Sequence, residues 1–438
     1  MSETSFPKVP NRWLIVVGGS LIQLCLGAIY AWSAFTGKLT DHNGSFGFSK
    51  VQTQVIFSTS LFCFALFMAL IAGRWQAKAG PRTVALTGGV VMGLGYLISS
   101  MMPTFWGMML GVGLVAGAGI GLTYVCPIAA LVKWFPDKKG LITGLAVAGF
   151  GFGALIWVKL TEGFKFGPVD LTPGWKGLYG AGWTVPQVFM LYGILFAVLI
   201  GLGALTLCNP PDGWRPEGWT PPEPSAASTT GAANFGPREM CRTPQFWGMF
   251  VTFVFASVAG LMVIGVIKLF GIDALMAHGM PKDEANLATG TAMGLFYALA
   301  NGLGRIAWGA ISDRIGRQRS LVLLSGIQGL VMLAFFYLGG SVAGLCVGAA
   351  LVGFNYGGNF ALFPAICADF FGNKTLGLNY PMLFLAYGLG GIIGPILGGR
   401  MGDQKMWLWA FVPAGIACLW SSIIIARLRP PTLADAEA

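Results

Sequence analysis

Apolar runs of about 20 residues recur along the whole chain, and they constrain its fold more than any other feature. A run of that length crosses the hydrocarbon core of a bilayer as a helix, because a helix satisfies its own backbone hydrogen bonds. The chain is 55% hydrophobic and 10% charged, whereas a soluble protein carries about 25% charged residues. The sequence therefore predicts an all-α, multi-pass membrane protein.

The apolar runs predict about twelve spanning helices in two sets of six. They lie near 13–36, 51–72, 84–102, 105–132, 141–160, 186–208, 246–272, 288–311, 319–338, 342–367, 378–399 and 407–427. Between the sets, residues 209–243 are rich in Pro, Gly, Ser and charge, a composition that does not form a packed core. We expect an N-terminal six-helix half (1–208), a linker (209–243) and a C-terminal six-helix half (244–438).

Loop charges predict the orientation, because short cytoplasmic loops are enriched in Lys and Arg. Basic residues such as Arg74, Lys133 and Arg314 fall on the same side as the termini and the linker. We therefore expect both termini and the linker to be cytoplasmic, in the cell (inner) membrane. The long outer loop, 161–185, is either a lid or an interfacial segment. Its aromatic residues favour the interfacial interpretation, since Trp and Tyr are common at membrane surfaces.

Composition also excludes several classes of function. The net charge of +10 comes from loop residues rather than from a basic domain, so no nucleic-acid partner is expected. The eight cysteines lack metal-site spacing and lie mostly in apolar runs, which indicates neither zinc nor a disulfide framework. Two histidines in predicted loops and no acidic cluster argue against a membrane enzyme, and no cofactor is expected. A non-transporting sensor would carry a large soluble extension, which neither the tails nor the linker offers.

One charged residue, Arg305, lies within the predicted span 288–311. A guanidinium at the centre of a spanning helix costs at least about 3 kcal/mol, and its planar fork matches a carboxylate or phosphate. Tyr297 and Asn301 precede it at spacings of eight and four residues on the same helical face, so the stripe predicts an anion site. The alternative is an arginine that snorkels to the cytoplasmic surface, since Asp313 follows only about 12 Å further along the helix.

Two pairs of segments repeat between the halves. Residues 73–82 after span two correspond to 309–319 after span eight, and 133–140 correspond to 369–375. Parallel repeats of this kind place a substrate site between the halves, near the membrane midplane.

The second copy reads Gly309-x3-Asp313-x2-Gly316-Arg-x-Arg and resembles the loop signature of the major facilitator superfamily. The resemblance implies a monomer of two six-helix halves that works by alternating access. It also implies gating roles for four residues: Gly309, Asp313, Arg314 and Gly316. In the first copy Ala77 occupies the acidic position, so only the C-terminal gate is expected to be intact.

Within that superfamily the chain resembles the oxalate/formate antiporter family, which is related to monocarboxylate transporters. The resemblance is carried by residues 27–33, 117–124, 133–138, 242–247, 357–364 and 379–380. It implies that Arg305 binds the substrate and that an oxalate exchanger would add a Lys where this chain has Tyr387. One fixed cation suits a monocarboxylate better than a dianion. Lys268 could replace the missing charge, but its place near the outer end favours snorkelling.

Four tyrosines lie in spans that line the cavity in this superfamily: Tyr30, Tyr124, Tyr356 and Tyr387. Each phenol is either a hydrogen-bond donor to the substrate or an ordinary packing residue. Tyr124 and Tyr356 are the better candidates because their segments are rich in glycine. Asn355 and Asn359 are expected to form hydrogen bonds between helices.

We therefore expect a transporter of a small, lactate-like monocarboxylate, with a proton as cosubstrate and membrane lipid around it. The alternative is carboxylate exchange of the oxalate/formate type. Related proton-linked carriers often have an Asp one turn before the Arg, where this chain has Asn301, and no predicted span has a central Asp or Glu. A proton could travel on the substrate acid, or the protein could exchange anions.

Overall fold

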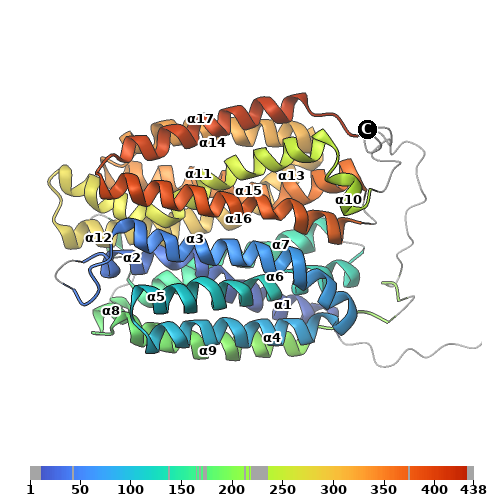
Figure 1. Ribbon diagram of the computed structural model, residues 1–438, viewed down its shortest axis with the longest axis horizontal. Helices are drawn as coiled ribbons and strands as arrows, with labels where there is room; N and C mark the ends of the chain where they lie inside the picture. The colour runs from blue at the N-terminus through green and yellow to red at the C-terminus, as the bar shows by residue number, and fades with distance from the viewer. Residues whose placement is uncertain are drawn as a thin grey trace, which may run out of the picture.

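The computed structural model describes residues 11–41, 44–136, 139–163, 165–166, 169–170, 175–211, 214–216, 218, 235–372 and 375–431. Long helices run side by side along the long axis of the molecule (Figure 1). The described strands are a two-residue pair in the 161–185 loop, β1 (Lys165–Phe166) with β2 (Val169–Asp170). The predicted all-α fold is confirmed. The centre of the predicted linker, both chain ends and His42 lie outside the described residues.

The helices form an N-terminal and a C-terminal group, below and above the middle of Figure 1. The N-terminal group comprises α1 (Arg12–Leu26), η1 (Gly27–Trp32), α2 (Ser33–Leu39), α3 (Lys50–Phe67), η2 (Met68–Ala72), α4 (Gly73–Met101), α5 (Phe105–Met108), η3 (Met109–Ala116), α6 (Gly117–Trp134), α7 (Lys139–Thr161), α8 (Gly177–Gly180) and α9 (Val185–Thr206). The C-terminal group comprises α10 (Pro237–Met240), α11 (Pro244–Ala277), α12 (Lys282–Thr291), η4 (Ala292–Tyr297), α13 (Ala298–Ile315), α14 (Arg317–Leu338), α15 (Val342–Phe371), α16 (Leu376–Asp403) and α17 (Trp407–Arg427).

Ten helices in the described ranges are long and apolar enough to cross a membrane. One of them, Lys50–Met101, contains predicted spans two and three. It bends between them at Gly80, whose φ of 79° is accessible to glycine and strained for other residues. The predicted eighth span is the continuous run of α12, η4 and α13, which carries Arg305 and is not among the ten. Gly316 is the counterpart of Gly80 in the second repeated segment, and its φ is 91°. The loops at 73–82 and 309–319 therefore make the same turn.

The two groups are in close contact along α3 and α16, which lie side by side in Figure 1. Glycines of α16 face α3 along its length. A Cβ atom added at Gly388, Gly391 or Gly399 would lie 2.8 Å from a side-chain atom of Ala65, Leu61 or Gln54, respectively. Small residues of this kind let helix backbones approach closely in lipid. A second contact joins α7 to α13, and the candidate site lies there.

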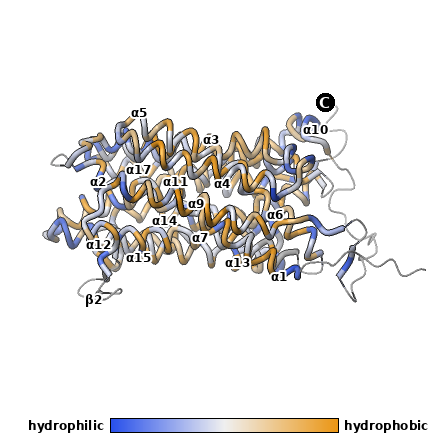
Figure 2. The backbone as a smooth tube through the Cα atoms, turned by 90° about the horizontal axis from the view of Figure 1, so that it is seen from below, coloured by the Kyte–Doolittle hydropathy of each residue, from blue (hydrophilic) through white to orange (hydrophobic). Residues whose placement is uncertain are grey.

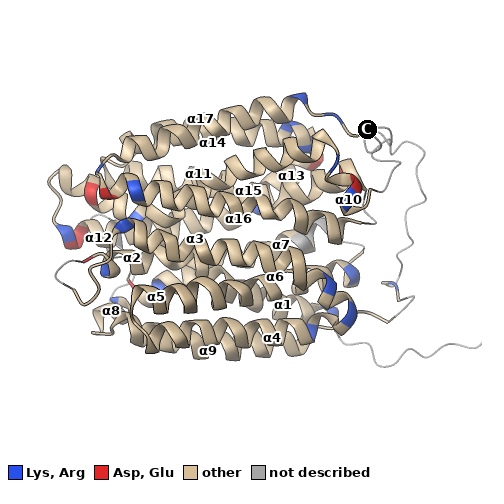
Figure 3. Ribbon diagram, in the orientation of Figure 1, with Lys and Arg blue, Asp and Glu red and all other residues tan. Residues whose placement is uncertain are grey.

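Charged residues gather at the two ends of the helices, with apolar segments between them (Figures 2 and 3). We call the end with α10 and Asp313 the linker end, and the end with α2, α8 and α12 the distal end (Figure 1). Among the residues that the structure describes, three ion pairs join the two helix groups, all at the distal end: Lys50–Asp273 at 2.5 Å, Lys282–Asp41 at 3.6 Å, and Lys268–Glu162. Among described residues no such pair joins the groups at the linker end.

Asp403 adds a charged contact at the distal end. Its carboxylate accepts hydrogen bonds from the backbone nitrogens of Lys50 (2.7 Å) and Val51 (3.0 Å), at the first turn of α3. These nitrogens have no partner within their own helix, and the positive end of the helix dipole favours an anion there. The side chain of Asp403, in the C-terminal group, thus caps α3 of the N-terminal group. Together with the ion pairs, this contact keeps the distal end closed.

Candidate anion-binding site

Arg305 lies inside the protein, between α13 and α7, with 1% of its surface exposed. Its Nε donates to Oδ1 of Asn301 (3.2 Å) and its Nη1 donates to the carbonyl of Val147 in α7 (3.0 Å). Its Nη2 has no hydrogen-bond partner among the described residues. The side chain therefore does not snorkel to the linker end. An unpaired buried donor costs about 1–3 kcal/mol, so an anion that accepts from Nη2 would be stabilised there.

Glycine allows α7 to approach α13 closely enough for this contact. A Cβ atom at Gly151 would lie 2.7 Å from Oδ1 of Asn301 and 2.9 Å from the backbone nitrogen of Gly302. The carbonyl of Val147, one turn earlier, consequently reaches the guanidinium. Val147 could not be predicted from the sequence, because a backbone acceptor carries no side-chain signal.

Two phenylalanines flank the cation. The guanidinium carbon of Arg305 lies 4.2 Å from the ring centre of Phe360 (α15) and 5.5 Å from that of Phe150 (α7). At these distances the ring faces attract a cation and replace part of its lost hydration. Neither residue was predicted, since a Phe in an apolar span is not distinguishable from any core residue by sequence alone.

Three of the predicted tyrosines meet in one cluster. The Tyr30 hydroxyl lies 3.3 Å from that of Tyr387 and 3.5 Å from that of Tyr356, and all three side chains are at most 1% exposed. The Tyr30 ring packs edge-on against Phe150, with centres 5.0 Å apart, so the cluster adjoins the arginine. Tyr124 also packs against Phe150, at 5.4 Å. Tyr356 and Tyr387 pack against Phe360, so all four tyrosines contact one of the two rings that flank Arg305.

Other polar residues of these helices have structural partners. Tyr297 donates its hydroxyl to the carbonyl of Gly260 (3.4 Å). The Asn359 amide donates to the carbonyls of Asn355 (3.4 Å) and Tyr356 (3.2 Å) within its own helix. For Asn359 the expected hydrogen bond between helices is therefore wrong, because the nearest acceptors are the carbonyls one turn earlier in α15.

The predicted gating residues lie at the linker end. Asp313 is 65% exposed and pairs with Arg317 (2.5 Å), four residues further along the chain. Arg317 also donates to the Ser312 hydroxyl at 2.5 Å. The Asp313 ion pair therefore lies within the C-terminal group in this state. Arg314 is exposed, and Gly309 is an open helical position whose added Cβ would lie 3.8 Å from Ala361. The gating roles of these residues stay predictions.

Lys268 does not snorkel, contrary to the sequence-based expectation. Its side chain is 1% exposed and pairs with Glu162, a partner that was not predicted from the sequence. The outer loop also differs from an interfacial segment at Tyr179, which is partly buried, with its ring centre 6.3 Å from that of Phe35. Burial raises the pKa of the Tyr179 hydroxyl well above its usual value, so it stays neutral. Trp175 and Trp183, each 39% exposed, fit the interfacial interpretation.

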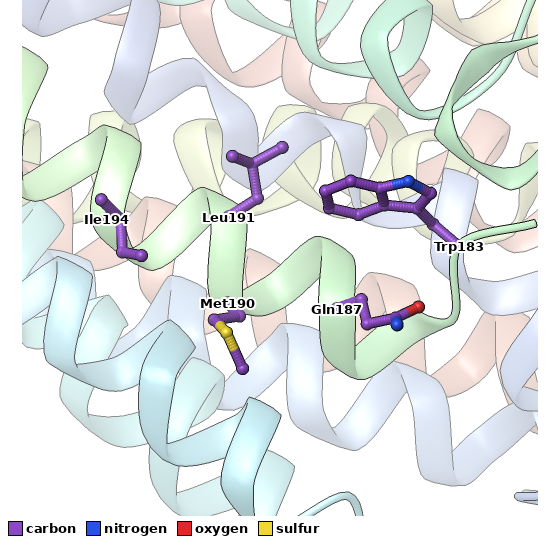
Figure 4. Close-up of a pocket in the computed structure, with 5 residues that line it drawn as sticks. All are labelled: Trp183, Gln187, Met190, Leu191 and Ile194. Carbon is purple, nitrogen blue, oxygen red and sulfur yellow. The ribbon is translucent and has the colours of Figure 1, made fainter. Parts of the chain in front are cut away.

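Two surface pockets lie away from this site. One has a volume of about 300 Å³ and is lined by Trp183, Gln187, Met190, Leu191 and Ile194, all on α9 or just before it (Figure 4). The other, about 590 Å³, lies between α11 and α17. Both lack a charged lining residue, so neither offers a partner for an anion.

Comparisons with known proteins agree on a family. A profile of the Major Facilitator Superfamily matches residues 13–342 and 274–438. The oxalate:formate antiporter of Oxalobacter formigenes is 27% identical over 431 residues, which cover 96% of this chain and 93% of that protein. The apicoplast pyruvate carrier 1 of Toxoplasma gondii is 27% identical over 87% of this chain and 82% of its own length.

A solved structure shows the same fold. It is a bacterial homologue of the human lysosomal transporter Spinster, in an inward-facing and unoccupied conformation. The two structures superpose with a TM-score of 0.64 over 98% of each chain, at 15% sequence identity. The predicted helical membrane architecture is therefore confirmed.

Proposed function

Because the chain belongs to the Major Facilitator Superfamily and is a transporter rather than an enzyme, we propose that it carries a small, lactate-like monocarboxylate together with a proton. The observation that supports this most directly is the buried guanidinium of Arg305, whose Nη2 has no hydrogen-bond partner among the described residues. Relatives that are an oxalate:formate antiporter and a pyruvate carrier support a small carboxylate as the cargo.

The charges around the site favour a monoanion. Arg305 is flanked by phenyl rings and neutral hydroxyls, and Tyr387 stands where the related exchanger is expected to have a Lys. A carboxylate that accepts from Nη2 would neutralise the cation, and the Tyr30 hydroxyl would donate to a second substrate oxygen. A dianion would bring a second charge into an apolar site without a second cation, which is costly.

Transport follows from the position of Arg305 between the helix groups. We take residues 1–208 and 244–438 as the two halves and residues 209–243 as a cytoplasmic linker in the cell (inner) membrane, so the distal end is the outer end. Carboxylate binding removes the net charge of the site and lowers the cost of enclosing it, so the halves can rock and expose it to the other side. The transporter functions as a monomer, in contact with membrane lipid and without nucleic acid.

Exchange of the oxalate/formate type is the alternative, and the relative from Oxalobacter formigenes favours it. In that case the proton would have no role, and an internal carboxylate would be required for the return step. The absence of an acidic residue among the described contacts of Arg305 is consistent with either mode.

Uptake into proteoliposomes separates the two modes. Labelled L-lactate, pyruvate, formate and oxalate are supplied outside, first with an inward proton gradient and no internal substrate. Monocarboxylate uptake that rises with the gradient supports the proposal. Uptake that starts only after the vesicles are loaded with another carboxylate supports exchange instead. If none of the four acids is taken up under either condition, the proposal is wrong.

A further inference from the structure

The ion pair between Lys268 and Glu162 joins the two helix groups at the distal end. Lys268 lies in α11, and Glu162 directly follows α7. Their side chains are 1% and 6% exposed. Among the described residues no other Lys, Asp or Glu is buried to this degree. A buried ion pair adds little net stability, because both groups lose their hydration. Its presence is therefore better explained by a function than by stability of the fold.

The surroundings of the pair are small or neutral. Gly290 of α12 faces the carboxylate, and a Cβ there would lie 2.8 Å from Oε2 of Glu162. Gly37 of α2 faces the lysine, and its Cβ would lie 3.6 Å from the Lys268 Cε. Oε2 has no hydrogen-bond partner among the described residues, and the recorded hydrogen bond of the ammonium goes to Glu162. Lys268 thus holds a carboxylate that the chain itself supplies.

Lys268 also lies on the same side of the bundle as the candidate site. It follows Gly260 by eight residues on α11, and the Tyr356 ring packs against Gly260. Eight helical residues rise by about 12 Å, so Lys268 lies roughly that far beyond the tyrosine cluster, toward the distal end. Glu162 follows α7 of the N-terminal group, and Lys268 lies in α11 of the C-terminal group. Opening the distal end would therefore move Glu162 away from Lys268. Lys268 would then be a cation on the path to Arg305, without its partner.

We infer that Lys268 is an outer binding site for the transported carboxylate, occupied by the side chain of Glu162 while the distal end is closed. This inference rests on the proposed function. An incoming acid replaces Glu162 on Lys268 when the distal end opens, and then passes to Arg305. When the end closes, Glu162 pairs with Lys268 again, which favours movement of the acid inward over its return.

The rival explanation is that the pair only holds the distal end closed. Two variants separate these explanations, because both lack the ion pair and they differ in the charge of Lys268 alone. They are E162Q and the double variant E162Q/K268Q, with E162Q/K268M as a second neutral replacement if the glutamine does not fold. Each carries no unpaired buried carboxylate, and thermal unfolding in detergent checks that it is folded.

The measured quantity is the KM for labelled L-lactate and for labelled oxalate, in right-side-out membrane vesicles for entry and in preloaded vesicles for exit. We expect the outer KM of E162Q/K268Q to be about tenfold above that of E162Q, as loss of one charge-assisted hydrogen bond predicts. The KM for exit should be the same in both. K282Q is the control, because Lys282 lies at the same end but is 62% exposed. It should leave the outer KM unchanged.

Equal outer KM values in the two variants would show that the pair is a latch only, and would overturn the inference. An equal rise on both sides of the membrane, or the same rise in K282Q, would also overturn it. If the parent protein takes up neither acid, the proposed function fails and this inference fails with it. If the parent protein is active and the outer KM values of E162Q and E162Q/K268Q are equal, only the Lys268 site is refuted and the proposed function stands.

Discussion

Replacement of Arg305 by lysine tests whether the fork of the guanidinium, rather than its charge, recognises the substrate. Lysine keeps the positive charge but is a point donor on a flexible stem. Asn301 and Val147 hold the plane of the guanidinium, whereas an ammonium group with the same partners has no fixed plane and presents no fixed donor at the position of Nη2. R305K should therefore retain attraction for an anion and lose the oriented hydrogen bond that Nη2 donates to the substrate.

The size of the effect follows from the contacts that the lysine cannot make. A hydrogen bond to a charged group contributes about 1.5–3 kcal/mol, and about 1.4 kcal/mol changes an equilibrium tenfold. Loss of one such bond to the substrate predicts a fall of about 10- to 100-fold in kcat/KM for uptake. R305Q also removes the charge, and its uptake should fall below detection. Both proteins should fold, because the recorded partners of Arg305 are a neutral amide and a carbonyl.

The assay is initial uptake of labelled L-lactate into proteoliposomes with equal amounts of folded protein, confirmed by thermal unfolding. K282Q controls for the loss of a distant cation. A kcat/KM of R305K within about twofold of the parent would refute the argument from the fork. Normal uptake by R305Q would remove Arg305 from the binding site altogether.

Three further changes probe the surroundings of the site. G151A places a Cβ 2.7 Å from Asn301 Oδ1, and it should reduce uptake and lower the free energy of unfolding by about 1–3 kcal/mol. The control G144A, in the same helix, places a Cβ with no atom within 4 Å and should change neither quantity. Uptake into proteoliposomes and thermal unfolding are measured for both variants. Y387K supplies a second cation and should raise the oxalate-to-lactate uptake ratio about tenfold, a change that Y387F should not produce. D403N weakens the cap of α3 and should lower the unfolding free energy by about 1 kcal/mol, which parent-like melting would contradict.

The helices and the central cation are the part of the structure that sequence could predict. Membrane length and hydropathy determine most spans, and Arg305 is conspicuous because few charges are tolerated at that depth. The eighth span was also predicted, although α12 begins with charged residues and α13 ends with them. The tyrosine cluster followed from the resemblance rather than from hydropathy.

The partners of the charges could not be predicted in the same way. Val147 acts through its backbone, and its position depends on the close approach of α7 to α13 at Gly151. Glu162 and Lys268 are 106 residues apart, and each lies near the end of a predicted span. A charge at that place ordinarily snorkels to water. Only the folded arrangement shows that the two residues meet.

The glycines of α16 bear on how fast the two helix groups can change their relative position. Side chains that interdigitate must leave one set of rotamers before a helix can roll over its neighbour, whereas Gly388, Gly391 and Gly399 present a nearly smooth face to α3. The contact between α16 and α3 therefore offers little resistance to small rotations of one helix against the other. The contacts at the two ends of the helices would then control how often the protein changes state. The rate at which the protein changes state could then evolve through a few residues at the helix ends, without any change in the contact between α3 and α16.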